Sequence, residues 1–140
     1  MGTDIRGNQA LLVTPFLENG DFDEGSYNRL IDFVMDGGVH GILAIGTTGE
    51  FFSLAIEEWQ YIMDITAQKL KGQTLLGFGC GHSGTREAVK MAQYAEKVGA
   101  DYLMVTPPYY FPNTPEGILA HYEAIADSVE IEVMLYDGGG

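Results

Sequence analysis

Five short apolar segments recur along the chain, about 30 residues apart. They cover residues 10–13, 41–45, 74–78, 102–105 and 133–136. Most of them are apolar at nearly every position, which is typical of parallel strands that are covered on both faces. We therefore expect five strands in one parallel sheet.

The gaps between these segments carry apolar residues at helical spacing, i, i+3, i+4 and i+7. The four stripes comprise Tyr27, Leu30, Ile31 and Val34; Trp59, Ile62, Met63, Thr66 and Leu70; Ala88, Met91, Ala92, Ala95 and Val98; and Ile118, Tyr122, Ile125 and Val129. We expect four helices there.

Polar residues and glycines at the ends of these stripes predict where the helices begin and end. The expected N-caps are Asp23, Ser53, Ser83 and Thr114, and Pro115 would occupy the first helical position of the last helix. The residues expected to end the first three helices are Gly37, Gly72 and Gly99.

Strands that alternate with helices indicate βαβ units and therefore an α/β fold. An open doubly wound sheet and an α/β barrel both satisfy this pattern. In either architecture the chemistry lies where strands pass into helices. The segments expected at those places cover residues 14–22, 46–53, 79–83 and 106–114.

Charge and hydropathy exclude several classes of protein. The chain has 20 acidic and 7 basic residues, a formal net charge of −13, whereas nucleic-acid binding needs a basic surface. No apolar run approaches the roughly 18 residues of a membrane helix, and the N-terminus lacks the layout of a signal peptide. We expect a cytoplasmic protein that binds neither nucleic acid nor membranes.

The cysteine and histidine content predicts no metal site. Cys80 is the single cysteine, which excludes an internal disulfide and a cysteine-based zinc cluster. His40, His82 and His121 have no metal-ligand spacing, so we expect them at surface or capping positions. No cofactor is expected.

Two of the strand-to-helix positions carry candidate chemistry. Gly46-Thr47-Thr48-Gly49-Glu50 would present two hydroxyls and its turn amides to a small anion such as a carboxylate, although Thr and Gly are also common in turns without ligands. Tyr136 ends the fifth strand, where its hydroxyl either relays a proton or is buried in a hydrogen bond.

Two other segments are more ambiguous. Residues 79–84 match G-x-G-x-x-G, but they follow the third strand, and Asp101 opens a strand instead of closing one. Close glycine packing is therefore favoured over nucleotide binding. Residues 106–115 contain four prolines and three aromatic residues, which suits core packing, a binding wall or a subunit contact.

Several short motifs occur in order along the chain: Leu12-Val13-Thr14-Pro15-Phe16, Gly20, Asp23, Gly46-Thr47-Thr48-Gly49-Glu50-Phe51, Gly99-Ala100-Asp101, Thr106-Pro107-Pro108-Tyr109-Tyr110 and Leu135-Tyr136. Together they resemble the pyruvate-dependent class I aldolase family, which includes dihydrodipicolinate synthase, N-acetylneuraminate lyase and 2-keto-3-deoxy sugar-acid aldolases. The resemblance favours the barrel. It implies half of a TIM (βα)8 barrel, (βα)4 plus a fifth parallel strand, over residues 1–137, with residues 138–140 as an added glycine tail.

The resemblance also implies a lyase mechanism and a substrate. In this family a barrel lysine forms a Schiff base with pyruvate or another small 2-keto acid. Thr48 would hold the pyruvate carboxylate, helped by the turn amides between Gly46 and Gly49, and Thr47 would join a hydroxyl relay.

Two tyrosines would complete that relay. Tyr136 matches the tyrosine that shuttles protons, and Tyr110 matches a tyrosine that dihydrodipicolinate synthases supply across a subunit interface. Glu132 and Asp137 stand where the family usually has a proline and an asparagine.

The resemblance places the Schiff-base lysine on a sixth strand, beyond the last residue of this sequence. The lysines present fall on expected helices: Lys69, Lys71, Lys90 and Lys97. We therefore expect an inactive fragment of a pyruvate aldolase or lyase. An engineered half-barrel scaffold, with at most weak carboxylate binding, is the alternative.

Open sheet edges predict self-association into dimers or larger assemblies. Glu130 and Glu132 place charge on the expected last strand, which would instead favour a monomer.

Overall fold

A computed structural model describes residues 3–137. Within that range five strands form one parallel sheet in the order β1-β2-β3-β4-β5. The strands are β1 (Gln9–Leu11), β2 (Gly41–Ala44), β3 (Leu75–Gly79), β4 (Tyr102–Val105) and β5 (Glu132–Leu135). Each lies within two residues of the predicted segment, so the prediction of five parallel strands is confirmed.

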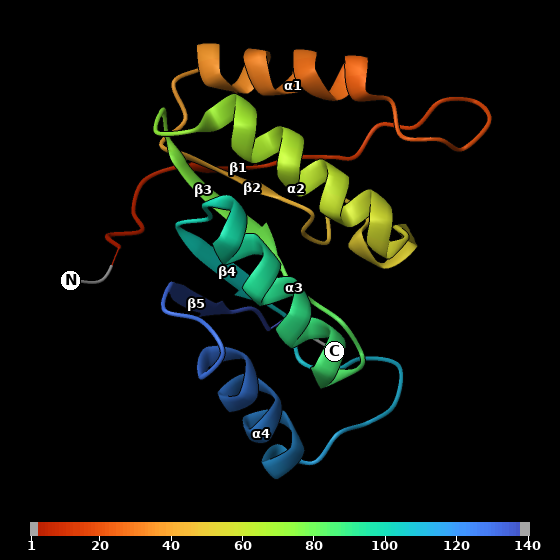
Figure 1. The fold of residues 1–140 in the computed structure, drawn as a ribbon, viewed down its shortest axis with the longest axis vertical. Helices are drawn as coiled ribbons and strands as arrows, with labels where there is room; N and C mark the ends of the chain where they lie inside the picture. The colour runs from red at the N-terminus through yellow and green to blue at the C-terminus, as the bar shows by residue number, and fades with distance from the viewer. Residues whose placement is uncertain (1–2, 138–140) are drawn as a thin grey trace.

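The helices connect successive strands and lie on the same side of the sheet (Figure 1). They are α1 (Glu24–Asp36), α2 (Ile56–Leu70), α3 (Thr85–Val98) and α4 (Pro115–Ala126), and a short 3₁₀ helix, η1 (Phe51–Ser53), precedes α2. A doubly wound sheet would reverse its strand order and place helices on both faces. The sequential order therefore confirms half of a TIM (βα)8 barrel.

The outer face of the sheet and the helices enclose the main core. Its strand residues alternate, because successive side chains of a strand point to opposite faces. Ile42, Phe78 and Leu103 are completely buried there. They meet helix residues of the predicted stripes, among which Trp59, Ile62 and Ala92 are buried.

The inner face, which would line the barrel, has a smaller cluster. Leu43, Tyr102 and Met104 are buried in it, and Tyr136 packs against them. Other side chains of this face are open: Leu11 and Val13 are each 48% exposed.

Two glycines make room for Tyr102 to span the inner face. A Cβ on Gly77 would lie 2.3 Å from the Tyr102 ring, and one on Gly41 would overlap the side chain of Gln9. The Tyr102 hydroxyl donates to Gln9 Oε1 over 3.2 Å, which links β4 to β1 across two intervening strands. Burial, followed by the charge of Asp101, raises the pKa of Tyr102 to about 12.

Two predicted helix starts are confirmed. The Asp23 side chain accepts a hydrogen bond from Ser26 N at 2.9 Å, and the Thr114 hydroxyl accepts one from Gly117 N at 3.1 Å, with Pro115 as the first residue of α4. Gly37 and Gly99 are the C-caps of α1 and α3, so these two predicted ends are confirmed as well.

Two predicted N-caps are wrong. Ser53 belongs to η1, and α2 begins after Ala55, whose N–H donates to Glu58 Oε2 at 2.8 Å. Ser83 is replaced by Gly84 as the N-cap of α3. At α2 the Glu58 carboxylate takes the place of a serine cap, whereas α3 begins without a side-chain cap.

The end of α2 and the start of β5 also differ in detail from the sequence pattern. Lys71 is the C-cap of α2, and Gly72 follows it with φ +71°, so the glycine lies one position beyond the cap. Glu130 lies before β5, and its N–H donates to Glu96 Oε1 at 2.7 Å. Of the two glutamates expected on the last strand, only Glu132 belongs to it.

Candidate functional site at the carboxyl ends of the strands

The loop from β2 to η1 contains two residues in the left-handed backbone region. Ile45 has φ +58° and Glu50 has φ +54°, and they bracket Gly46-Thr47-Thr48-Gly49. A β-branched residue such as Ile45 rarely adopts this conformation, which costs on the order of 1–3 kcal/mol and persists only when its surroundings impose it. The loop is thus held in one shape.

Neighbouring backbone imposes that shape. A Cβ on Gly79 of β3 would lie 2.0 Å from the Ile45 carbonyl oxygen, so β3 admits the turn only because it has glycine there. Gly49 N donates to Gly46 O at 3.0 Å, and the buried hydroxyl of Thr14 donates to Gly49 O at 2.7 Å.

The two threonines between these anchors are exposed. Within residues 3–137, neither the Thr47 nor the Thr48 hydroxyl has a hydrogen-bond partner in the protein. A rigid loop with two unpaired hydroxyls beside turn amides can accept a small anion without rearranging, which lowers the entropic cost of binding.

Tyr136 lies at the same end of the sheet as this loop. Its N–H donates to Val105 O at 2.8 Å, which continues the pairing of β5 with β4. Its half-buried ring packs in the inner cluster with Met104, and a Cβ on Gly46 would lie 3.2 Å from Met104 Cε. The inner cluster therefore lies between Tyr136 and the start of the threonine loop.

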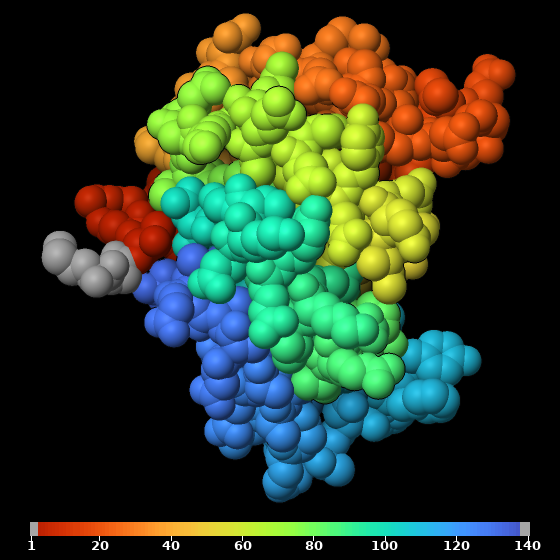
Figure 2. Space-filling view, viewed as in Figure 1, coloured from red at the N-terminus to blue at the C-terminus, as the bar shows by residue number. Residues whose placement is uncertain are grey.

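Tyr110 is not brought to this place within the chain. Its side chain is 87% exposed, its φ is +84°, and its ring packs edge-on against Phe111. The loop 106–114 that carries it projects from the body of the molecule (Figure 2). Tyr109 instead packs against Phe51 of η1 with ring centroids 5.8 Å apart, which couples this loop to the threonine loop.

Sequence reasoning missed Thr14, Ile45 and the contact between Tyr109 and Phe51. Thr14 lies in a segment predicted to reach this end of the sheet, but nothing in the sequence says which atom its hydroxyl contacts. The left-handed Ile45 has no sequence signal, because isoleucine itself disfavours that conformation.

The glycines of residues 79–84 serve close packing. Gly79 lies against Ile45, and a Cβ on Gly81 would lie 2.5 Å from Thr106 Oγ1. Gly84 N donates to His82 Nδ1 at 2.9 Å and closes the loop. Cys80 is completely buried, and burial raises the pKa of its thiol.

One histidine prediction is wrong. His121 was expected at the surface or as a cap, but only 1% of its surface is exposed. His121 belongs to the buried face of α4 together with Ile125, although the predicted stripe did not include it, because its ring lies between α4 and α3. His40 is exposed and His82 acts at a loop, as predicted.

The lysines lie outside the inner face. Lys69 pairs with Asp32 at 2.7 Å, Lys90 pairs with Glu87 at 2.9 Å, and Lys97 lies over the Tyr94 ring. Lys71 is the C-cap of α2.

Among the residues that the structure describes, no helix is long and apolar enough to cross a membrane, and no group of three or more His, Cys, Asp or Glu side chains could hold a metal ion.

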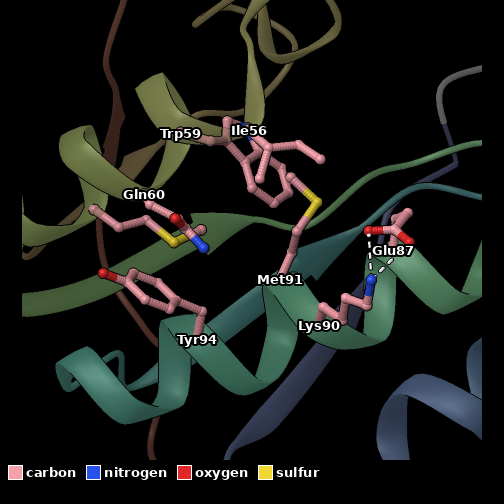
Figure 3. Close-up of a pocket in the computed structure, with 8 residues that line it drawn as sticks. Ile56, Trp59, Gln60, Glu87, Lys90, Met91 and Tyr94 are labelled. Atoms are coloured by element: carbon pink, nitrogen blue, oxygen red, sulfur yellow. Dashed lines mark hydrogen bonds and ion pairs between the residues drawn. The ribbon is translucent and has the colours of Figure 1, made fainter.

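The hollows on the outer surface lie away from the threonine loop. One of about 270 Å³ lies between α2 and α3, where Trp59, Met63 and Met91 form an apolar floor beside the Glu87–Lys90 pair (Figure 3). Another, of about 440 Å³, lies at the opposite end of the sheet and includes Asp101. The threonine loop contributes to neither lining.

The sequence profile of the dihydrodipicolinate synthetase family matches residues 4–139. The chain belongs to this family. A 4-hydroxy-tetrahydrodipicolinate synthase from a Nitratiruptor species is 39% identical over 137 residues, which cover 97% of this chain and 46% of that protein. The resemblance seen in the ordered motifs is thereby confirmed.

Solved structures agree with the family assignment. Dihydrodipicolinate synthase from Aquifex aeolicus superposes with a TM-score of 0.91 at 34% identity, covering 95% of this chain and 45% of that one. The Acinetobacter baumannii enzyme, solved with pyruvate, also gives a TM-score of 0.91 at 34% identity, covering 96% and 46%. The chain spans less than half the length of these members of the dihydrodipicolinate synthetase family and corresponds to the N-terminal half of their barrel.

Proposed function

We propose that the threonine loop of this half-barrel binds the carboxylate of pyruvate or another small 2-keto acid. The observation that carries the proposal is the rigid loop between Ile45 and Glu50, whose two threonine hydroxyls have no partner within the described residues. Thr48 and the amides between Gly46 and Gly49 would hold the carboxylate. The pyruvate complex of the Acinetobacter baumannii relative supports this choice of ligand.

The chemical step would be Schiff-base formation on a lysine that the described residues do not supply. Thr47, Tyr136 and Tyr110 would relay protons around the carbonyl. Tyr110 is too exposed to act within its own subunit, so a second subunit would receive it. The chain by itself would recognise the keto acid without forming the covalent intermediate.

A titration with pyruvate, followed by NMR shifts of Gly46–Glu50, tests the binding step. Thr48→Val removes one charge-assisted hydrogen bond worth about 1.5–3 kcal/mol, so Kd should rise about tenfold or more. Thr74→Val, which lies between α2 and β3, is the matched control and should leave Kd unchanged. If pyruvate causes no NMR shifts at these residues in the unmodified chain, the binding proposal is rejected and the alternative of an engineered half-barrel scaffold is favoured.

Borohydride trapping with pyruvate and intact-mass measurement tests the chemical step. The expected result is no adduct. A specific adduct on one of the helix lysines would contradict the proposed inactivity.

We also propose that the chain self-associates through its open sheet edges, with a second copy as the partner. The inner face leaves Leu11 and Val13 half exposed, and Met134 on the same face of β5 is 38% exposed; Leu135, on the outer face of β5, is 62% exposed. The outer edges of β1 and β5 have no neighbouring strand within the described residues, and such edges favour pairing. Glu132 weakens this tendency but stands at only one position.

Sedimentation velocity at micromolar concentration tests the association. The expected result is a species larger than the 15.3 kDa monomer. A single monomeric species over the whole concentration range would contradict it.

The glycine tail at residues 138–140 lies outside the described residues, and its assignment as an addition stays a prediction. The cytoplasmic location stays a prediction as well.

A further inference from the structure

We propose that His121 is a positioning residue, whose neutral ring joins the first turn of α3 to the end of β4 and thereby holds the loop 106–114 in place. The inference concerns the loop itself. Its importance for a keto-acid site, through Tyr110, rests on the proposed function.

Three elements meet at this ring. His121 lies on α4, and its Nδ1 is 2.9 Å from the hydroxyl of Thr85, the first residue of α3. Thr106, the residue that follows β4, faces the ring through its backbone. The ring also packs edge-on against Tyr122 of its own helix, with centroids 5.8 Å apart. His121 is thus the point at which α3, α4 and β4 are tied together.

Some of the polar atoms around the ring have a hydrogen-bond partner and others have none. His121 Nε2 and Thr106 Oγ1 are both buried without a hydrogen-bond partner in the part of the chain that the structure describes. A buried polar atom left unpaired costs about 1–3 kcal/mol, so the position of both atoms calls for a structural explanation. We assign the Nδ1 lone pair to the Thr85 hydroxyl and the Nε2 proton to the side of the Thr106 backbone.

The charged groups near the ring favour its neutral form. Burial lowers the pKa of His121, the Thr106 backbone raises it, and the charge of His82, from the loop before α3, lowers it again; the net shift is downward. Tyr122 contributes no charge at neutral pH, because burial and the nearby Asp137 carboxylate raise the pKa of its hydroxyl. Within residues 3–137, none of the groups that shift the pKa of His121 is a carboxylate, so protonation would place an uncompensated charge between α3 and α4.

The joint is connected to the exposed tyrosines by a stiff segment. Thr106 is followed by Pro107 and Pro108, whose rings fix the backbone angle φ. Asn113 Nδ2 then donates to Pro108 O at 2.7 Å and to Phe111 O at 3.0 Å, which braces the loop internally. A displacement of Thr106 would therefore move Tyr109 and Tyr110 with it.

The pH dependence follows from the direction of the shift. The folded state binds the proton less readily than the unfolded chain, so the joint is complete above the ordinary histidine pKa of 6.5 and is lost as the pH falls below it. A role limited to filling space would show no such profile.

Hydrogen exchange of the amides of Thr106, Tyr109, Tyr110, Phe111 and Asn113, expressed as protection factors, measures the joint between pH 5 and 7.5. In the unmodified chain, protection of this loop should fall about tenfold over that interval, while protection of α1 stays constant. His121→Phe should show the low protection at every pH. His121→Asn, which keeps a polar group near Thr85, should recover part of the protection and lose the pH profile.

Matched variants separate this joint from the other histidines. His40→Gln alters an exposed histidine at the opposite end of the sheet and should leave the profile unchanged. His82→Asn removes the neighbouring ring whose charge lowers the pKa of His121, and the profile should persist with its midpoint shifted upward. If His121→Phe fails to fold, Thr85→Val decides, because it removes only the hydroxyl and should reduce loop protection several-fold.

Unchanged loop protection in His121→Phe, or in Thr85→Val where the former does not fold, overturns the proposal. A flat profile in the unmodified chain also overturns it. The measurement contains no ligand, so a failed pyruvate titration would leave this inference standing.

Discussion

The two faces of the sheet differ in how completely this chain covers them. On the outer face, the helices bury Ile42, Phe78 and Leu103 completely. On the inner face, Tyr102 spans the sheet, while Leu11 and Val13 stay half exposed. The difference indicates that the outer core supplies most of the folding stability, whereas the inner face is the surface through which we propose that the chain associates.

The largest expected effect is on the outer face. Phe78→Ala should lower the free energy of unfolding by about 3–5 kcal/mol, because it leaves a cavity in a fully packed region. Leu11→Ala, on the inner face, is the control and should cost about 1 kcal/mol or less. Urea denaturation measures both. Equal losses would show that the two faces contribute alike.

The next effect tests how tightly the inner face is packed where it is closed. Gly77→Ala would place a methyl group 2.3 Å from the Tyr102 ring, so we expect a loss of about 1–3 kcal/mol in the free energy of unfolding. Gly117→Ala, in the first turn of α4 with 3.4 Å to the nearest atom, is the control and should be neutral or stabilising. A neutral Gly77→Ala would mean that the ring moves freely.

A smaller effect tests the link between β4 and β1. Tyr102→Phe removes the hydrogen bond to Gln9 and should cost about 0.5–1.5 kcal/mol. The raised pKa of Tyr102, about 12, means that folding favours the protonated phenol. Stability is therefore complete below pH 10 and is lost as the pH rises towards 12. Urea titrations from pH 9 to 11.5 should show a shallower decline in Tyr102→Phe, and parallel curves would contradict this.

The smallest effect on stability is expected where the inner face is open. Val13→Ser should change the free energy of unfolding by about 0.5 kcal/mol or less, but it should shift the sedimentation distribution towards monomer. Phe33→Ser, on the exposed face of α1, removes an even more accessible apolar group (76% exposed) from a helix instead of the sheet and is the control. If both variants, or neither, alter the distribution, the edges are not the contact.

The positions of helices and strands could be predicted because the apolar pattern records which residues face the outer core. Trp59 and Ile62 of α2, for example, follow the predicted stripe. The N-caps of α2 and α3 could not, because Ser53 and Ser83 are good caps by type, and only the tertiary structure places Ala55 and Gly84 at the first turns. The prediction for His121 was wrong for a similar reason. A histidine is suited to a surface as well as to a buried position, and its burial depends on how closely α3 and α4 pack.

The candidate site was only partly readable in the same way. The order of its motifs pointed to Thr47, Thr48 and Tyr136, and the structure places all three at the carboxyl ends of the strands, while their roles stay a prediction. The conformation of Ile45 and the exposure of Tyr110 could not be predicted, because both depend on contacts between segments far apart in the sequence.

By itself, the sequence determined the alternation of strands and helices, the family and the segments that gather at one end of the sheet, because these depend on side-chain type and spacing. Only the tertiary structure decided that the threonine loop starts at a left-handed Ile45 packed against Gly79, that Tyr102 closes part of the inner face, and that Tyr110 is exposed. Those features arise where backbone meets backbone across strands, and the contact distances that impose them are not written in any local pattern.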